Sequence, residues 1–556
     1  MEAHGYLVPL SISIPIATVT FGLLWYCQKK NHAKPNSDKV HHELKKSRSR
    51  ITVGLESKPR KSGWKISSDL NLSEVGVNFN QWRKPVSRWG PDEDDMKSLY
   101  TQLDINESDW KHATSTVDSV LHMLLCQMKK RLNKDVIIKE YIKQGSSREG
   151  LKVGKADEFD VLMLFHINDL PLETEHLTDA YNNMLPEFGR LVVADDIDPE
   201  RYKWFFKNEC IEWDDSLDKF CLNSRKLHEK LFISLIQSAS HDIQVTVNDS
   251  NKDLYKFTLN RIRKNPPAVN IEIEIIFPRN IEENHVIQSL KEVKDRHYRS
   301  VLESANRDLP KICRRVINVD IVPAIQIGME KVPDPTDWNK TMECPRYAVF
   351  RWVETNQAAA GKYACPPELR WRLCSSGYEK HVIDVARGST EQSYILTALR
   401  ILKWKFTSLQ ETWEPPQLVA HVRSYHLKHI AFYCILYLTV LNKVHLTGVK
   451  QALAYLLDFL SIALTERRLP HFFHDNEFIV YMFPDYNVAD NTLRYDLFID
   501  KTDDCLLQAK MSFKRLKLRE EMCDNVFTYP EYANTFQKYI QAGKYYTGNY
   551  CRAYEH

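Results

Sequence analysis

Apolar residues recur at helical spacing in several long segments of the chain. One segment carries them at the i, i+3, i+4 and i+7 positions of an amphipathic helix: Val117, Val120, Leu121, Leu124, Leu125, Met128 and Leu132. Three later segments have the same pattern, with breaks at Pro415-Pro416 and Leu469-Pro470: 390–407, 425–443 and 447–465. The chain from about residue 360 onward is therefore predicted to be helical.

Shorter apolar runs between polar and breaker residues predict buried strands. The candidates are Phe159–Phe165, Ile243–Val247, Val269–Phe277 and Val316–Ile325. Helices are expected to separate these strands, one of them around 283–306, and the Gly145-Ser146-Ser147 turn is expected to end a helix. The predicted fold class is α+β, with a mixed β-sheet lobe followed by a helical lobe.

The N-terminus differs from both lobes. Residues Tyr6–Cys27 carry no charge, and about 20 apolar residues suffice to cross a bilayer as a helix. No small-residue cleavage site follows, which favours an uncleaved anchor over a signal peptide. A buried apolar N-terminus is the alternative. Lysines begin directly afterwards, at Lys29 and Lys30, so the positive-inside rule places the rest of the chain in the cytosol.

These patterns divide the chain into four parts. Residues 1–28 form the predicted single transmembrane helix. Residues 29–105 are rich in Lys, Ser, Asn and His and weakly periodic, which predicts a basic flexible tether. Residues 106–345 form the sheet-containing core and residues 346–556 the helical C-terminal lobe. A basic tether beside a membrane attracts anionic lipid, and the same composition suits nucleic acid equally well.

Charge and cysteine content narrow the picture. A formal net charge of +3 is close to neutral, so any nucleic-acid binding depends on a local basic face. The 12 cysteines are scattered, without a CxxC pair or a tight Cys/His cluster. This usage predicts free, buried thiols in a reducing compartment and no zinc site.

Three carboxylates carry the candidate chemistry. Glu158 and Asp160 are two residues apart in a predicted strand, so their side chains point to the same face. Asp320 lies in another apolar strand, where a carboxylate is costly unless it has a partner or a function. Such a set suits Mg²⁺ or Mn²⁺, and two such ions support phosphoryl transfer by an in-line displacement. We therefore predict a metal-dependent nucleotidyltransferase.

A glycine turn precedes these carboxylates. Gly145 and Ser146 would present backbone N–H groups and a hydroxyl to a triphosphate. Glycine suits this position because the backbone has to approach the phosphate closely. An isolated ExD pair also fits an exposed or salt-bridged strand, and the turn together with the later Asp320 favours the catalytic interpretation.

At these residues the sequence resembles the cyclic GMP-AMP synthase-like receptors of the male-abnormal (Mab) superfamily. The block GSSREGLKVGKADEFDVLMLF is similar to their signature, and later blocks follow in the family's order: NPPAVNIEI, INVDIVPAI, RWRLCSSGYEK, VRSYHLKHIAFYC and LPHFFHDN. The resemblance covers roughly residues 110–545. It implies a bilobal nucleotidyltransferase that joins ATP and GTP, or related nucleotides, into a cyclic dinucleotide second messenger of innate immune signalling.

The resemblance also implies roles for individual residues. Glu158, Asp160 and Asp320 would hold two magnesium ions, and Ser146 would contact the nucleotide triphosphate. The resemblance further implies that a long ligand, often double-stranded RNA or DNA, activates the enzyme.

Further positions would bind the nucleotides. Arg372 would contact a purine base and Glu379 the ATP side, while Lys403 would meet phosphates. Ser424 and Tyr425 would hold a base and stack on it. Taken without the resemblance, Tyr425 also fits a helix core and Arg372 an ordinary salt bridge.

Two features bear on the activating ligand. The vertebrate DNA sensor of the family carries a zinc-binding His/Cys insertion, whereas the stretch Lys380–Leu399 has His381 and no cysteine, which favours double-stranded RNA over DNA. A basic run ends the first predicted helix, and a solvated helix face is its alternative interpretation. The candidate nucleic-acid face consists of Lys129, Lys130, Arg131 and Lys134, extended by Arg314 and Arg315.

An N-terminal anchor is unusual for these receptors. It is a feature of the transmembrane inositol-trisphosphate-receptor-interacting branch of the superfamily, which is regarded as non-catalytic. The carboxylates Glu158, Asp160 and Asp320 argue against that branch, because a scaffold has no need of them. A catalytically inert, membrane-anchored adaptor is therefore the alternative to the enzyme.

Overall fold

The computed structural model describes most of the chain after residue 81, and the described residues belong to one compact unit. They are 82–132, 134–178, 184–195, 197–250, 256–262, 267–276, 314–351, 365–473, 496–498 and 501–542. The predicted anchor Tyr6–Cys27 and the predicted helix around 283–306 lie outside them. Within the described part, no helix combines the length and the apolar character that a membrane crossing requires.

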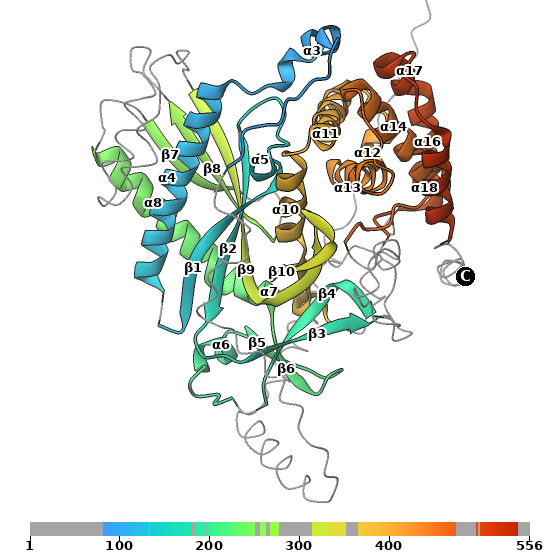
Figure 1. Ribbon diagram of the computed structural model, residues 1–556. Coiled ribbons are helices and arrows are strands. Elements are labelled where there is room, and N and C mark those ends of the chain that lie inside the picture. Colours follow the sequence, from blue (N-terminus) through green and yellow to red (C-terminus); the bar gives the residue numbers. More distant parts are fainter. Residues whose placement is uncertain are drawn as a thin grey trace, which may run out of the picture. The chain divides into compact units, whose positions relative to one another are not determined.

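A mixed sheet with eleven described strands forms the centre of the fold (Figure 1). Its main order is β1-β2-β9-β10-β11-β4-β6-β5, while β3 pairs with β4, and β7 joins through β8 to β9. The strands are β1 (Val136–Gln144), β2 (Glu158–Ile167), β3 (Leu172–Thr178), β4 (Met184–Val193), β5 (Ile211–Asp214), β6 (Lys219–Leu222), β7 (Lys256–Ile262), β8 (Val269–Ile276), β9 (Arg314–Asp334), β10 (Asp337–Phe350) and β11 (Trp371–Cys374).

The long strand β9 organises the sheet. One of its edges pairs in parallel with β2, and the other pairs antiparallel with β8 and then with β10. The predicted strands Phe159–Phe165, Val269–Phe277 and Val316–Ile325 correspond to β2, β8 and β9, with Phe277 outside the described residues. β11 also belongs to this sheet, so the sheet continues beyond residue 345, where the sheet-containing part was expected to end.

Helices of the sheet-containing part cover the sheet. They are α4 (Glu107–Arg131), α5 (Gly145–Glu149), α6 (Lys203–Lys207), α7 (Ser224–Leu227), the π-helix His228–Phe232 and α8 (Ile233–Ser250). The predicted amphipathic helix is present as α4, whose N-cap Asn106 accepts hydrogen bonds from the backbone of Ser108 and Asp109. α4 packs against α8, and both contribute to the hydrophobic core beneath the sheet.

Two local predictions in this part are wrong. The predicted strand Ile243–Val247 lies within α8, because the buried positions Ile236, Ala239, Ile243 and Val247 follow helical spacing over the longer window while Val245 is exposed. The Gly145 turn does not end a helix. Strand β1 separates α4 from Gly145, which instead begins the short helix α5.

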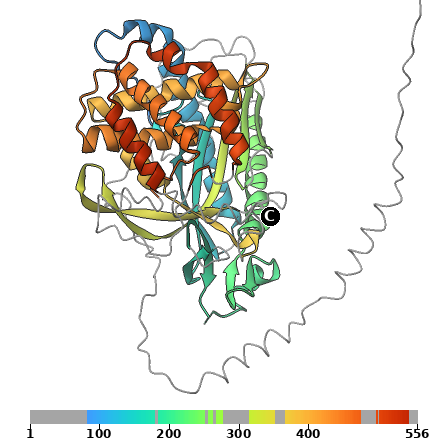
Figure 2. The ribbon, with the colours of Figure 1, turned by 90° about the vertical axis from the view of Figure 1, so that its right-hand side faces the viewer.

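The C-terminal part is helical, as predicted, and Figure 2 shows its helices gathered in one group. Its helices are α10 (Ser376–Ala386), α11 (Thr390–Gln410), α12 (Gln417–His421), α13 (Ser424–Cys434), the π-helix Ile435–Leu441, α14 (Val449–Glu466), α16 (Asp503–Leu516), α17 (Leu518–Cys523) and α18 (Pro530–Ala542). The three predicted segments correspond to α11, to α13 with its π-helical continuation, and to α14. Together they form a second hydrophobic core.

Residues 82–104 are ordered and contact both cores; we call them the N-terminal strap. The strap contains helix α3 (Asp94–Leu99) and the 3₁₀ turn Thr101–Leu103. It buries four apolar side chains in the core of the helical part: Val86, Met96, Tyr100 and Leu103. The predicted flexible tether 29–105 is therefore wrong for this portion, because irregularly spaced apolar residues each find a partner in the fold.

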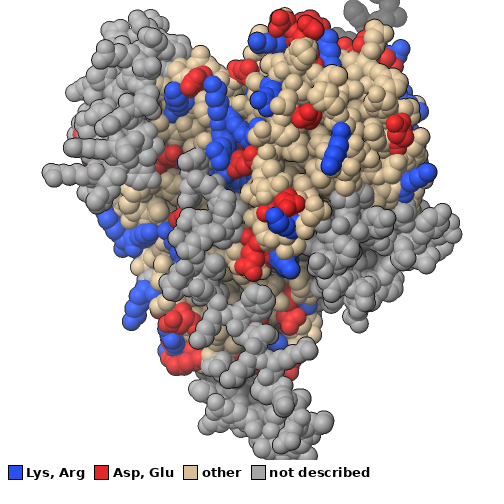
Figure 3. All heavy atoms as spheres, viewed as in Figure 1, with Lys and Arg blue, Asp and Glu red and all other residues tan. Residues whose placement is uncertain are grey.

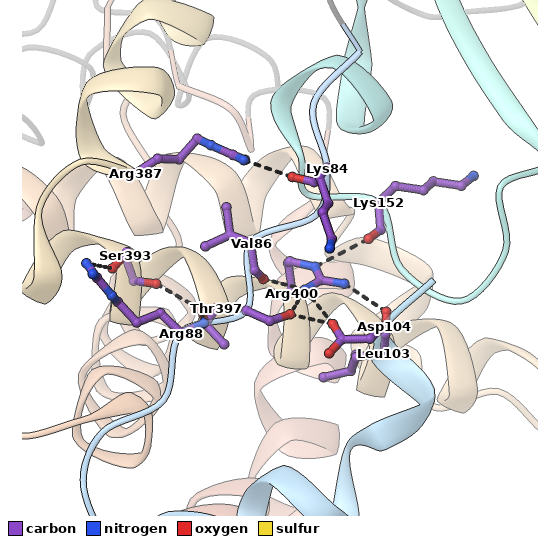
Figure 4. A network of polar contacts seen from close by, with 11 residues as sticks. Lys84, Val86, Arg88, Leu103, Asp104, Lys152, Arg387, Ser393, Thr397 and Arg400 are labelled. Atoms are coloured by element: carbon purple, nitrogen blue, oxygen red, sulfur yellow. Dashed lines mark hydrogen bonds and ion pairs between the residues drawn. The ribbon is translucent and has the colours of Figure 1, made fainter. Parts of the chain in front are cut away.

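Polar contacts fasten the strap as well (Figure 4). The buried guanidinium of Arg400 on α11 donates to the carbonyl oxygens of Val86 and Leu103 and to the side chain of Asp104. The carboxylate of Glu93 accepts the backbone N–H groups of Val449 and Lys450 and so caps the N-terminus of α14. The nine described cysteines are free, and six of them are buried as predicted, whereas Cys126 is exposed and Cys374 and Cys505 are partly exposed.

Candidate active site

The three predicted carboxylates lie on two adjacent strands. Asp160 on β2 is the direct partner of Asp320 on β9 in the parallel pairing, and Glu158 precedes Asp160 by two residues on the same face. Strands far apart in the chain thus bring three carboxylates together. Asn270 on β8, the partner of Asp320 on the opposite edge, donates its side-chain N–H to Asp320 Oδ1 at 2.6 Å.

The negative charges at this site are strongly coupled. Burial raises the pKa of Asp160, and the neighbouring charges of Glu158 and Asp320 raise it further, to about 7. Lys152 opposes this rise. Like-charged carboxylates at adjacent sheet positions are unfavourable unless a cation neutralises them, and oxygen donors of this kind fit Mg²⁺ or Mn²⁺. The donor set therefore fits the predicted metal.

Gly145 lies against the carboxylate of Asp160. A Cβ atom at Gly145 would overlap with Oδ2 of Asp160, and the residue has a φ of +65°, a conformation that favours glycine. Ser147 Oγ donates to the carbonyl oxygen of Glu158 at 2.8 Å, which ties α5 to the start of β2. Ser146, the predicted triphosphate contact, is the second residue of α5 and is partly exposed beside this position.

The predicted phosphate ligand Lys403 contacts the loop that follows α5. Its Nζ donates to the carbonyl oxygen of Leu151 at 3.0 Å. Burial lowers the pKa of Lys403 to about 8, although Glu149 opposes the decrease. Lys403 therefore lies near the carboxylate strands, at the junction between α11 and the sheet-containing part.

The other predicted nucleotide ligands form a second cluster. The guanidinium of Arg372 on β11 lies 5.8 Å from the ring centroid of Tyr425 on α13, a cation–π arrangement. The hydroxyl group of Tyr425 lies 2.9 Å from Nε2 of His471. Ser424, one residue earlier, is exposed at the start of α13. Tyr425 is only partly buried, so its ring is not an ordinary core side chain.

Glu379 belongs to a buried ion pair within this cluster. Nζ of Lys428 lies 2.6 Å from its carboxylate and 2.8 Å from the carboxylate of Glu149 on α5. Burial opposes ionisation of Glu379, but the charge of Lys428 and hydrogen bonds from Lys428 and Ser375 outweigh it and lower the pKa to about 2. The predicted ATP contact is thus engaged with protein partners in this structure.

Lys428 was not predicted, although a signal for it exists. It lies three residues after Tyr425 on α13, which places both side chains on one helix face. Its ammonium group also lies 5.4 Å from the Tyr425 ring centroid. Lys428 therefore links the Tyr425 cluster, through Glu149, to the helix that begins beside Asp160.

Glu379, His429 and His471 have potential ligand atoms within 4.8 Å of one another. Their hydrogen bonds do not suit a metal ion. The backbone N–H groups of Phe472 and Phe473 donate to Nδ1 of His429 and His471, so each neutral ring carries its proton on Nε2. Metal binding at Nε2 would require that proton to move to Nδ1, which would break the hydrogen bond from the backbone, and Glu379 is already paired with Lys428. We interpret this trio as structural support for the Tyr425 cluster.

The predicted nucleic-acid face lies elsewhere. Lys129, Lys130 and Arg131 are exposed in the last turn of α4, and Lys134 is exposed before β1. The nine residues of β1, at about 3.3 Å each, separate this basic end from α5. Arg131 pairs with Asp242 on α8.

The proposed extension of this face is not supported. The side chain of Arg315 is buried and pairs with Asp109 at 2.8 Å, which assigns it a structural role. The side chain of Arg314 lies outside the described residues. In contrast, Figure 3 shows a group of Lys and Arg side chains on the face that it draws. Lys84 and Lys155, before and after α5 in the chain, are exposed.

The carboxylate site and the Tyr425 cluster thus meet at the junction of the two cores, and the basic end of α4 is separate from both. The site also contains Glu149, Lys152 and Lys428, which sequence reasoning did not identify. Comparisons with known proteins do not add to this picture: no protein-family model matches the chain, and no curated protein matches it.

Proposed function

We propose that the protein is a metal-dependent nucleotidyltransferase that joins ATP and GTP, or related nucleotides, into a cyclic dinucleotide. One observation carries the proposal: Asp160 and Asp320 are direct partners across parallel strands, with Glu158 on the same face. Two divalent cations bound by these carboxylates would activate the attacking hydroxyl and stabilise the leaving pyrophosphate. A ribose hydroxyl of one nucleotide attacks the α-phosphorus of the other, a phosphodiester forms and pyrophosphate leaves; a second transfer closes the ring.

The residues around the carboxylates support binding of an anionic nucleotide. The missing side chain of Gly145 leaves its backbone next to Asp160, and the partly exposed Ser146 follows it in α5. Lys403 is partly buried nearby, and burial lowers the pKa of its ammonium group to about 8. We propose that Ser146 and Lys403 contact the triphosphate.

The Tyr425 cluster supports binding of a base. An aromatic ring that is only partly buried, next to the cation of Arg372, offers a stacking surface for a purine. Glu379 fixes Lys428, and Lys428 contacts both the ring and Glu149. We propose that Tyr425 stacks on a base, that Arg372 and Ser424 contact the same nucleotide, and that Glu379 contacts the ATP side through this cluster.

The remaining parts of the proposal rest on the resemblance. A long activating ligand, double-stranded RNA in preference to DNA, would bind the basic end of α4, and the product would act in innate immune signalling. The segment Tyr6–Cys27 would anchor the enzyme in a membrane with its folded part in the cytosol. A catalytically inert membrane-anchored adaptor is the competing proposal.

The full chain, incubated with labelled ATP, GTP, CTP and UTP, tests the proposal. The reactions contain Mg²⁺ or Mn²⁺ and either duplex RNA or duplex DNA. We expect a cyclic dinucleotide that Asp160→Asn and Asp320→Asn each reduce by at least about 100-fold, because each substitution removes a metal-binding carboxylate. Asp337→Asn, which changes a partly exposed acid in the β9–β10 hairpin, is the matched control and should retain activity.

Two results would contradict the proposal. Product formation that survives Asp160→Asn and Asp320→Asn would exclude these carboxylates from catalysis. Absence of product with a broad panel of duplexes, together with a thermal midpoint that nucleotide and Mn²⁺ leave unchanged, would favour the adaptor.

A further inference from the structure

The carboxylate site contains a cation supplied by the chain itself. Nζ of Lys152 lies 3.1 Å from Oε2 of Glu158 and 3.3 Å from Oδ1 of Asp157. The Lys152 side chain is 11% exposed, whereas that of Glu158 is 58% exposed. The ammonium group therefore belongs to a largely buried side chain, whereas the Glu158 side chain is accessible from solvent.

The position of Lys152 is set by the backbone of its loop. Three successive carbonyl oxygens of this loop accept hydrogen bonds from the strap and α11, and Figure 4 shows the one between Lys152 and Arg400. Gly150 O accepts from Val86 N at 3.0 Å, Leu151 O from Lys403 Nζ at 3.0 Å, and Lys152 O from Arg400 Nε at 3.3 Å. The strap and α11 thus fix the backbone of the loop, and with it the position of Lys152.

The negative charges of the site attract both the ammonium group of Lys152 and a divalent cation. Glu158, Asp160 and Asp320 repel one another without a cation, and a nearby ammonium group reduces that repulsion. A divalent cation satisfies the same carboxylates more strongly and requires an oxygen of Glu158 as ligand. The two cations therefore compete for one carboxylate.

We propose that Lys152 is a positioning residue, the resident counter-cation of the metal-free site, and that a divalent cation has to displace its ammonium group from Glu158. This inference rests on the proposed function, since it takes the three carboxylates to be metal ligands. Lys152 holds Glu158 in place before metal binds and weakens the site for metal in the absence of nucleotide. Metal loading is thereby biased toward the state in which substrate phosphates supply additional oxygen ligands.

Calorimetric titration of the full chain with Mn²⁺, in the absence of nucleotide, measures the Mn²⁺ affinity and tests this inference. We expect Lys152→Gln to bind Mn²⁺ about tenfold more tightly than wild type, because the competing charge is gone. Lys155→Gln makes the same charge change at an exposed position of the same loop and should bind within about twofold of wild type. Lys152→Arg, which keeps the cation, should resemble wild type.

Thermal unfolding separates this role from simple packing. In EDTA, Lys152→Gln should melt below wild type, and Mn²⁺ should raise its midpoint by more than it raises that of wild type. A lysine that only packs would lower both midpoints equally, and equal or weaker Mn²⁺ binding by Lys152→Gln would overturn the inference.

Asp160→Asn distinguishes failure of the proposed metal site from failure of the proposed role of Lys152. Loss of Mn²⁺ binding in Asp160→Asn with unchanged binding in Lys152→Gln would reject the inference and keep the metal site. Failure of wild type itself to bind Mn²⁺ would reject the metal site and the inference together.

Discussion

Single residues at this site are constrained by their immediate neighbours more than by any local propensity. Gly145 shows this directly, because its missing side chain leaves the space that the carboxylate of Asp160 occupies. Gly154, nine residues later, has a similarly positive φ of +75° but no atom within 4 Å of an added Cβ. A side chain would strain the backbone at both glycines, but only at Gly145 would it also overlap with a neighbouring residue.

We predict that Gly145→Ala loses Mn²⁺ affinity by at least about tenfold, since the new methyl group has to displace Asp160. Gly154→Ala should bind Mn²⁺ like wild type. Both substitutions place a side chain at positive φ and should cost about 1 kcal/mol of folding stability. Calorimetric titration and thermal unfolding of both variants check this, and equal Mn²⁺ affinity in the two would show that Gly145 does not position Asp160.

A second prediction at the residue scale concerns pH. The pKa of Glu379 is about 2, below its ordinary value of 4.5, so its ionised form stabilises the folded state. That contribution, on the order of 3 kcal/mol, is fully present above pH 4.5 and is lost as the pH falls toward 2. Glu379→Gln should therefore lower the thermal midpoint at pH 7 and lower it less at pH 4. A difference that stays constant or grows on acidification would contradict this assignment.

At the scale of elements, helix α14 depends on a cap from outside its own sequence. The residue before it is Gly448, which has no side chain to cap the helix, and Glu93 of the strap supplies the carboxylate instead. Gly448 is suited to this position because a Cβ there would lie 2.5 Å from Glu93 Oε1. The strap and the helical part are thus specified jointly.

We predict that Glu93→Gln destabilises the protein by about 1–2 kcal/mol, because the substitution removes a charged cap and its interaction with the helix dipole. Asp94→Asn, which neutralises the adjacent exposed acid, should change stability by less than about 0.5 kcal/mol. Thermal unfolding of the two variants side by side measures the difference. Equal thermal midpoints of the two variants would show that the Glu93 cap does not stabilise α14.

At the scale of the whole molecule, the strap joins the two cores. It contacts α5 and its loop through backbone hydrogen bonds, α11 through Arg400, and α14 through Glu93. The same Arg400 also donates to the carbonyl oxygen of Lys152 in the loop that follows α5. Removal of the strap should therefore affect both the stability of the helical part and the position of that loop.

We predict that a chain lacking residues 1–105 is less stable than one lacking residues 1–81 by on the order of 5 kcal/mol or more. The longer deletion exposes the core surface that Val86, Met96, Tyr100 and Leu103 cover, and each of these is worth about 1.5–3 kcal/mol. Urea unfolding of the two chains gives the comparison. Equal stability would mean that the strap contributes little to the fold.

Long periodic segments were predictable because their periodicity reports one buried face. The helices α4, α11 and α14 follow from this pattern alone, and the strands β2 and β8 follow from short apolar runs between polar and breaker residues. Ile243–Val247 failed because five residues with alternating apolar character are compatible with a strand as well as with part of α8. The strap failed for the opposite reason, since its buried residues have no period and depend on partners hundreds of residues away.

The sequence by itself determined the helical C-terminal part, the strands β2, β8 and β9, and the position of Glu158 and Asp160 on one face, because each depends on spacing within one segment. The tertiary structure decided which strands are neighbours, and so placed Asp320 beside Asp160. It also placed Lys152 and Lys428 among these acids and made the strap part of the fold. Apart from the contact of Lys152 with Glu158 six residues later, these contacts join residues far apart in the chain, and local patterns carry no information about such contacts.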